Sequence, residues 1–386
     1  MTDSTKVDPT EGASSAGAPL HPVGRLRSLD ALRGFDMVML LGGMYVLVAV
    51  SKALGWTQVA EVLEHQAEHP LWNGFTAWDL VFPLFLFLAG VSLPLSLAKQ
   101  RAAGATNGAL VRRALKRAAL LVFFGLVYNG LFGFEFERFR YASVLARIGL
   151  AWLGAALLWI YLPLRAVAIA GAVLLALHSC ALLFVPAPDL ELASASLEQG
   201  KTFSCWFDRV MVPGRMHRVT SDPEGLFGVI SAVGTALLGA FAGHWITSVQ
   251  HSRSRRIGGI ILFGSQCLVA GAVLDYFGLP INKNLWTASF TLWAGGFSLL
   301  LLAFFHWIFD VVRADRVALA FTVVGANSIL AYVASAFIRW QDVVDVLFAR
   351  GLSNGRLHAV MAPVLALLLQ WLILWALYRR RIFLRV

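Results

Sequence analysis

The chain has 386 residues, of which 58% are hydrophobic and 14% are charged, and its formal net charge is +10. A mean hydropathy of +0.70 is too high for a water-soluble protein of this length. The composition therefore excludes a soluble globular protein and indicates a membrane protein.

The expected elements run in chain order from a polar tail to a series of apolar segments. Residues 1–24 are rich in Ser, Gly, Ala, Pro and Thr and lack an apolar signal core, which predicts a disordered cytoplasmic tail. Residues 25–386 contain repeated apolar runs that can cross a bilayer, so we expect an all-α polytopic membrane domain with about ten transmembrane helices. The predicted spans are 31–54, 77–98, 118–134, 144–161, 166–186, 226–249, 258–278, 287–309, 317–338 and 358–378.

The basic residues are concentrated in alternate loops between the predicted spans. The start of the first span and the loop 99–117 are basic, whereas the loop that holds Glu61 and Glu64 is acidic. Under the positive-inside rule both termini are cytoplasmic and His69 faces the other compartment. Because topology accounts for the positive charge, no nucleic-acid partner is expected, and no spacing of metal ligands predicts a metal.

A short polar segment at the start of the second span is the strongest candidate for chemistry. His69 is a candidate acid, base or nucleophile, because histidine titrates near neutral pH, although a solvated interfacial histidine has the same pattern. Asn73 is a candidate for stabilising an oxyanion. Asp79 either caps the helix or takes part in catalysis. No neighbour is evident to orient His69, which favours a general base over a nucleophile.

Other polar residues occur within or beside the spans. Asp36 lies inside the first span and requires a partner or a wet cavity, and Arg147 lies a short way into the fourth. The segment from Ser221 to Leu226 has a helix-start pattern. Asn327 interrupts the ninth span, for which hydrogen bonding between helices is an alternative explanation. Arg140, Arg147, the 221–226 segment and the 280–287 turn map to the outer face or its edge, so we expect one shared polar site.

These residues carry a family resemblance. The segments that match, in order, are Leu26–Asp30 with Arg33-Gly34, His69 with Trp72-Asn73-Gly74, Asp79–Pro83, Arg140–Gly149, Asp222–Gly225, Ile281–Trp286 and Asn327–Leu330. Together they resemble the heparan-α-glucosaminide N-acetyltransferase family of transmembrane acetyltransferases, and they cover about residues 25 to 335.

The resemblance implies transfer of acetyl from cytosolic acetyl-CoA to the amine of a glucosamine-type acceptor on the outer face. It places the family's active-site histidine at His69 and its two arginines at Arg140 and Arg147. It also implies a bacterial-type relative in the inner (plasma) membrane, without the large lumenal domain of the lysosomal enzyme. Further candidates for substrate or cofactor binding are Asp36, Glu224, Asn282, Lys283 and Asn327.

The departures from the family concern the acceptor more than the chemistry. Gly43-Met44 stands where the lysosomal enzyme has an Asn, Ala146 stands where it has a Gln, and Asp36 is an addition. A homodimer is a further expectation. Two other function classes remain open: a carrier for an amino sugar or small anion, with Asp36 and Asp79 as coupling groups, and an O-acetyltransferase acting on a lipid or polysaccharide.

The donor needs cations at the cytoplasmic mouth, since acetyl-CoA carries several phosphate charges. Arg112, Arg113, Lys116 and Arg117 are candidates, although topology alone also explains this cluster. The acceptor amine must lose a proton before it attacks the thioester. His69 either takes that proton or is acetylated first to give an acetyl-imidazole.

Overall fold

The computed structural model describes residues 26–136, 139–348 and 355–384, and the predicted tail at 1–24 lies outside them. Within these ranges the secondary structure is helical, and the β pairing is a single isolated bridge between Arg140 and Gly214. The α-helices are α1 (Arg27–Val38), α2 (Met44–Ala53), α3 (Thr57–Gln66), α4 (Val81–Ala102), α5 (Asn107–Tyr128), α6 (Val144–Tyr161), α7 (Leu164–Phe184), α8 (Phe203–Met211), α9 (Val229–Ile246), α10 (Arg253–Tyr276), α11 (Ala288–His306), α12 (Asp315–Gly325), α13 (Ser328–Ala334), α14 (Trp340–Phe348) and α15 (Gly355–Arg379).

The predicted class, an all-α protein that spans a membrane, is confirmed. Among the described residues, 8 helical segments are long and apolar enough to cross a bilayer, or 9 if the bent pair α12 and α13 is one span. The predicted span 118–134 corresponds to part of α5, which begins earlier, at Asn107, and has 22 residues. Its first half carries four cations, so α5 is not apolar throughout.

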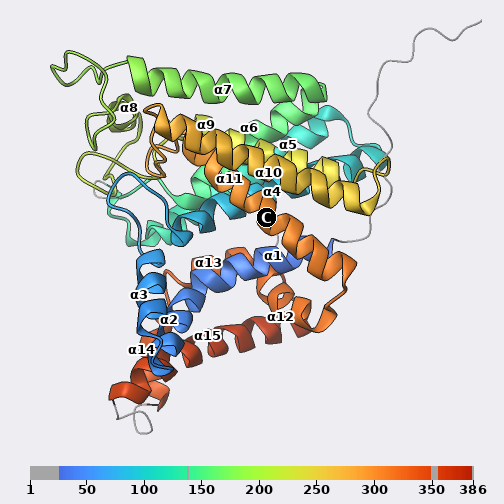
Figure 1. The fold of residues 1–386 in the computed structure, drawn as a ribbon. Helices are drawn as coiled ribbons and strands as arrows, with labels where there is room; N and C mark the ends of the chain where they lie inside the picture. The colour runs from blue at the N-terminus through green and yellow to red at the C-terminus, as the bar shows by residue number, and fades with distance from the viewer. Residues whose placement is uncertain (1–25, 137–138, 349–354, 385–386) are drawn as a thin grey trace, which may run out of the picture.

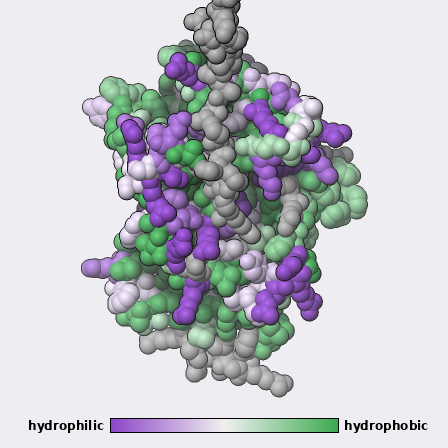
Figure 2. All heavy atoms as spheres, turned by 90° about the vertical axis from the view of Figure 1, so that its right-hand side faces the viewer, coloured by the Kyte–Doolittle hydropathy of each residue, from purple (hydrophilic) through white to green (hydrophobic). Residues whose placement is uncertain are grey.

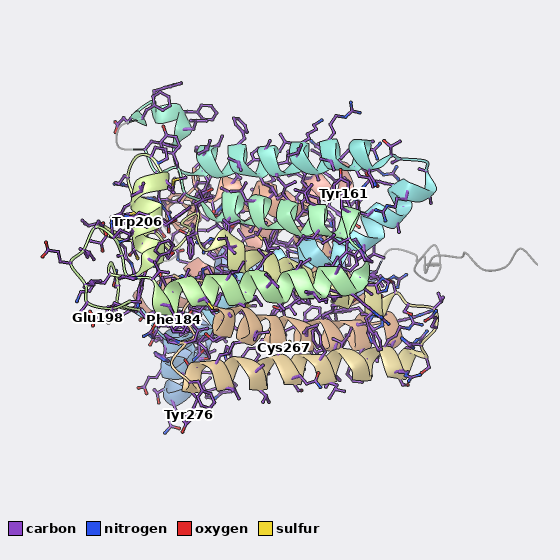
Figure 3. All side chains as sticks on the ribbon, turned by 90° about the horizontal axis from the view of Figure 1, so that it is seen from above. Tyr161, Phe184, Glu198, Trp206, Cys267 and Tyr276 are labelled. Carbon is purple, nitrogen blue, oxygen red and sulfur yellow. The ribbon has the colours of Figure 1, made fainter. Side chains whose placement is uncertain are left out.

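The long helices lie along a common direction (Figure 1), and the loop that contains α8 covers one end of the bundle. Figure 3 shows Phe184 of α7 and Tyr276 of α10 at the same end as Trp206, whereas Tyr161 of α6 lies at the opposite end. That opposite end faces the viewer in Figure 2, where hydrophilic side chains gather. We call the two ends the α8 end and the basic end.

Close contact between α4 and α9 forms the centre of the bundle. A Cβ atom on Gly90 would lie 2.1 Å from the carbonyl oxygen of Ala236, and one on Gly239 would lie 2.0 Å from that of Phe87. Glycine therefore lets the two backbones touch, as small residues do between membrane helices. This contact holds α4, which directly follows the turn that carries Asp79, against the helix that follows the α8 loop.

Three helices that begin at the α8 end, α4, α6 and α11, are capped by residues of the loops before them. Thr76 and Asp79 form a capping box at the 3₁₀ turn η2 (Ala77–Leu80), which continues into α4. Ser143 accepts the Ala146 N–H of α6 at 3.1 Å, and Thr287 accepts the Phe290 N–H of α11 at 3.3 Å. The sequence pattern at 221–226 does not start a helix directly, because α9 begins only at Val229.

Two breaks interrupt helices near the middle of the bundle. Gly42, with φ of +125°, lies in a π-helical turn, η1 (Met39–Gly43), between α1 and α2. The axes of α12 and α13 differ by 57°. At that second break Asn327 donates to the Ile382 carbonyl and accepts the Leu384 N–H, both at 2.9 Å. The Asn327 side chain thus joins the break between α12 and α13 to the C-terminal segment.

Candidate active site

A cavity of about 360 Å³ opens at the α8 end among the loops that carry most of the polar motifs. A volume of this size is typical of a small-molecule site. The residues that line it come from segments far apart in the sequence: His69, Pro70, Trp72, Gly74, Asp79, Phe82, Tyr128, Asn129, Arg140, Val144, His217, Arg218, Pro223, Glu224, Lys283, Asn284 and Tyr332.

His69 is oriented by a buried carboxylate. Its Nδ1 lies 2.7 Å from Oδ1 of Asp79, and the Asp79 side chain is 1% exposed whereas that of His69 is 44% exposed. Oδ2 of Asp79 accepts the Thr76 N–H at 3.2 Å, which fixes the carboxylate. A carboxylate only accepts hydrogen bonds, so Nδ1 carries the donated proton and Nε2 is the nitrogen with a lone pair.

The expectation that no residue orients His69 is therefore wrong. His69 and Asp79 are ten positions apart, and only the fold of the intervening loop brings them together. The capping box directs the Asp79 carboxylate back toward the loop. There the carboxylate accepts a hydrogen bond from the Thr76 N–H at the helix start and contacts Nδ1 of His69. The two alternatives for Asp79, helix cap and site residue, are thus both present in the geometry.

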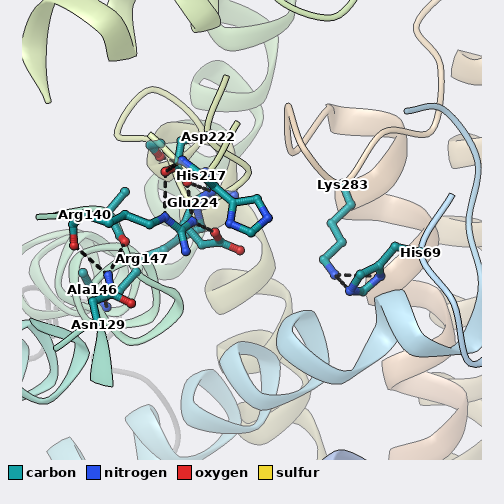
Figure 4. Close-up of polar contacts among 12 residues, drawn as sticks. His69, Asn129, Arg140, Ala146, Arg147, His217, Asp222, Glu224 and Lys283 are labelled. Carbon is teal, nitrogen blue, oxygen red and sulfur yellow. Dashed lines mark hydrogen bonds and ion pairs between the residues drawn. The ribbon is translucent and has the colours of Figure 1, made fainter. Parts of the chain in front are cut away.

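Lys283 completes this wall of the cavity, as Figure 4 shows. Its Nζ lies 3.2 Å from Asp79 Oδ1 and 3.3 Å and 3.4 Å from Nδ1 and Nε2 of His69. Burial lowers the pKa of Lys283, and the charge of Asp79 opposes that shift. We call His69, Asp79 and Lys283 the histidine wall.

Two loops are joined beside this wall. Asn282 donates to the side-chain oxygen of Asn73 at 2.9 Å, and Gly74 N–H donates to the Ile281 carbonyl at 2.9 Å. Neither Asn73 nor Asn282 lines the cavity. Asn73 and Asn282 hold the 69–76 loop against the 280–287 turn, and their expected roles in oxyanion stabilisation and substrate binding stay predictions.

A second polar wall surrounds Arg140. Its Nε and Nη2 donate to Asp222 at 2.8 Å and 2.6 Å, and Nη2 also pairs with Glu224. Asn129 donates to the Arg140 carbonyl at 2.7 Å and positions its backbone. The carboxylates hold the pKa of Arg140 above its ordinary value, against the effect of burial. We call Arg140, Glu224 and His217 the arginine wall, and Figure 4 shows it across a gap from His69 and Lys283.

Besides Asn282, three more expected binding residues lie outside the main cavity. Arg147 is buried, donates to the Gly225 carbonyl at 2.8 Å and lies 5.1 Å from the Trp286 ring centre, so it supports the second wall from behind. Asn327 binds the C-terminal segment, as described above. Asp36 lines a separate, narrow cavity of about 20 Å³ that shares Phe82 and Tyr332 with the main one.

The four cations of α5 do not converge on one point. Arg117 lies 4.2 Å from the Trp152 ring centre, and Arg113 donates to Gln100 at 2.7 Å. Arg112 and Lys116 are exposed on the basic end of the helix. At about 1.5 Å per residue, Arg117 lies about 16 Å along α5 from Tyr128 at the cavity.

Sequence reasoning missed several residues that line the cavity, among them Tyr128, His217 and Tyr332. The rings of Tyr128 and Tyr332 stack with centres 4.5 Å apart, and His217 comes from the α8 loop. No local pattern marks them, because each lies in a different segment and its place in the site depends on helix packing.

The fold and site define an integral membrane protein with a histidine–carboxylate cavity at one end of its helical bundle. Residues 25–131 match a family described as "Domain of unknown function (DUF5009)". The chain is 24% identical over 443 residues to heparan-alpha-glucosaminide N-acetyltransferase of Mus musculus, covering 99% of this chain and 64% of the relative. The Homo sapiens protein of the same name is 26% identical over 452 residues, covering 99% and 63%.

These matches confirm the resemblance to the heparan-α-glucosaminide N-acetyltransferase family that the ordered motifs predict. The chain spans less than two thirds of the length of these curated relatives.

Proposed function

We propose that the chain is a transmembrane N-acetyltransferase that moves acetyl from acetyl-CoA, bound from the basic end, to the amine of a glucosamine-type acceptor in the cavity at the α8 end. The observation that carries this proposal is the pairing of an open His69 with a sealed Asp79 inside that cavity. The names of the relatives support the same reaction class.

His69 Nε2 is placed to act as the general base. The amine lone pair attacks the thioester carbonyl carbon, and Nε2 takes the proton that the amine loses. A C–N bond forms, the C–S bond breaks, and the CoA sulfur leaves with the electron pair and takes up a proton. Asp79 stabilises the imidazolium that forms in this step, because its carboxylate already accepts from Nδ1.

Lys283 takes the role that the sequence assigned to Asn73. Negative charge develops on the carbonyl oxygen of the thioester in the transition state, and a fixed donor in a site shielded from water stabilises it. The Lys283 ammonium lines the cavity and lies 3.4 Å from Nε2 of His69, so it is adjacent to the reacting atoms. Asn73 is directed at Asn282 instead.

A narrow cavity beside the main one supports a path for the donor arm. The narrow cavity that Asp36 lines lies deeper in the bundle and shares Phe82, Val144 and Tyr332 with the main cavity. Its other residues, including Leu40, Phe85 and Ile148, are apolar. A slender thioester arm that passes this constriction emerges beside His69, while its charged end stays near the cations of α5.

The test is turnover with labelled acetyl-CoA and a panel of amino sugars. We expect His69→Ala to lower acetyl transfer by about 10²–10⁴-fold, the usual contribution of a general base. His65→Ala is the matched control, because His65 is exposed on α3 and does not line the cavity. Near-normal turnover of folded His69→Ala protein, or uptake of amino sugar into vesicles without acetyl-CoA, contradicts the proposal.

A further inference from the structure

The two carboxylates around Arg140 have different environments. Asp222 accepts four hydrogen bonds, from Nε and Nη2 of Arg140, from the His217 N–H at 2.8 Å and from the Glu224 N–H at 2.9 Å. Its side chain is 1% exposed and does not line the cavity. Two carboxylate oxygens offer about four lone-pair positions, so Asp222 is saturated and structural.

Glu224 is the carboxylate that faces the cavity. Its side chain is 13% exposed and lines the cavity, and the ion pair that the structure gives it is to Arg140. The pair fixes the position of the Glu224 carboxylate without enclosing it. His217 lines the cavity beside it, and the His217 backbone, rather than its ring, holds Asp222. Glu224 and His217 thus present a fixed acceptor and an imidazole to whatever lies opposite His69 (Figure 4).

Aromatic rings complete the same space. Tyr128 and Tyr332 stack on each other and line the cavity together with Phe82, whose ring is 6.5 Å from that of Tyr332. Aromatic side chains with a polar tip suit a ligand that has apolar C–H faces and polar edges. A carboxylate and an imidazole suit hydroxyl groups, which donate to the first and exchange hydrogen bonds with the second.

The size of the cavity suits a small polar ligand. Its volume of about 360 Å³ lies in the range of small-molecule sites, and one hexosamine ring with its substituents is a ligand of that class.

We propose that Glu224 and His217 bind the ring hydroxyls of a single hexosamine and so direct its amine at Nε2 of His69. This inference rests on the proposed function and assigns the arginine wall to the acceptor rather than to the donor phosphates. Arg140 positions Glu224, and the tyrosine pair packs against the sugar face.

The first experiment measures acceptor selectivity in purified full-length protein. The readout is the ratio of kcat/KM for glucosamine to that for cyclohexylamine, a six-membered ring amine without hydroxyls. Glu224→Gln keeps the size of the side chain but weakens a charge-assisted hydrogen bond, so we expect the ratio to fall about tenfold or more. Asp275→Asn is the matched control, because Asp275 caps the Ile281 N–H and lies outside the cavity.

A second variant covers the case in which Glu224→Gln fails to fold. His217→Leu removes only the ring and leaves the backbone bond to Asp222 intact, and we expect it to lower the same ratio. An unchanged ratio in the folded variants, or no preference for glucosamine in the wild-type chain, overturns the inference.

Calorimetric titration with glucosamine in the absence of acetyl-CoA separates this inference from the proposed reaction. Weaker binding to Glu224→Gln or His217→Leu than to the wild-type chain supports the acceptor site even if no acetyl is transferred to any amine. Equal binding in all three chains refutes the acceptor site even if acetyl transfer is observed.

Discussion

Replacing Asp79 by asparagine tests the histidine wall most directly. The Asp79 carboxylate contacts His69 at 2.7 Å, Lys283 at 3.2 Å and the Thr76 N–H at 3.2 Å, and its side chain is 1% exposed. Asparagine keeps the size but removes the charge, so the mostly buried Lys283, which is 12% exposed, loses its partner. Removing one side of a buried ion pair costs about 3–5 kcal/mol of folding free energy.

The same substitution changes the hydrogen bond at His69. The side-chain NH₂ group of the introduced asparagine can donate to Nδ1, which moves the histidine proton to Nε2 and removes the lone pair that the base needs. We therefore expect a loss of turnover of about 10²–10⁴-fold in the molecules that remain folded. Stability and activity thus fall together, for two separate physical reasons.

A double-mutant cycle distinguishes these two effects. Lys283→Met removes the unpaired cation, so Asp79→Asn combined with Lys283→Met should regain at least about 1 kcal/mol over the sum of the single effects. Unfolding of the purified protein in detergent, followed by tryptophan fluorescence against denaturant, measures this coupling, and acetyl transfer measures the activity. Turnover should not return in the double variant, because the histidine is still misoriented.

Two outcomes refute the reasoning about this wall. One is an Asp79→Asn variant as stable and as active as the wild-type chain. The other is strict additivity of the two substitutions, which means that Asp79 and Lys283 do not interact. Asp275→Asn controls for general damage to the 280–287 turn, because its carboxylate accepts the Ile281 N–H at 2.8 Å without touching the site.

Three further predictions concern the second wall, a buried acid and the topology. Arg140→Lys and Arg147→Lys should both lose thermal stability, because Lys cannot reproduce bidentate or stacked contacts. The KM for acetyl-CoA should stay unchanged in both variants. A raised KM without loss of stability would assign these arginines to donor binding instead. Burial raises the pKa of Asp208 to about 6, above an unfolded value of about 3.9. The folding stability present at pH 4 should therefore decline by about 3 kcal/mol as the pH rises through 6. In Asp208→Asn the denaturation midpoint should depend less on pH between 4 and 7, and the same pH dependence in the variant and the wild-type chain would contradict this. In a chain that carries Asn107→Cys, a membrane-impermeant thiol reagent should label that site only from the cytoplasmic side, and labelling from outside would reverse the proposed orientation of the donor and acceptor sites.

The positions of the helices follow from the sequence. Long apolar runs bounded by charged loops have one stable solution in a bilayer, because a helix alone satisfies its own backbone hydrogen bonds there. Among the described residues a helix overlaps each predicted segment, and 8 of these helical segments, or 9 with the bent pair α12 and α13, are long and apolar enough to span a bilayer. Helix α5 begins eleven residues before the predicted boundary at 118. The Asn327 break and the polar character of the 69–79 segment were likewise visible, since both depend on residue type within a local window.

Tertiary structure decided which residues make up the site. His69 and Asp79 were both candidates, but their hydrogen bond depends on how the loop between them folds back onto the 3₁₀ turn η2 before α4. Lys283 joins them because Asn73 and Asn282 fasten two loops that are more than two hundred residues apart. Asn73 and Asn282 looked like site residues in the sequence, and the same hydrogen bond turns them away from the cavity.

The sequence by itself determined the class of protein, the approximate spans and the single histidine on which the proposed chemistry depends. Each of these is set by composition or by short-range periodicity, which acts on a segment whatever its neighbours are. Only the tertiary structure decided which carboxylate serves that histidine, which one faces the cavity and which one is sealed behind Arg140. Hydrogen bonds and burial depend on distances of about 3 Å between segments far apart in the chain, and only the packing of the whole bundle sets those distances.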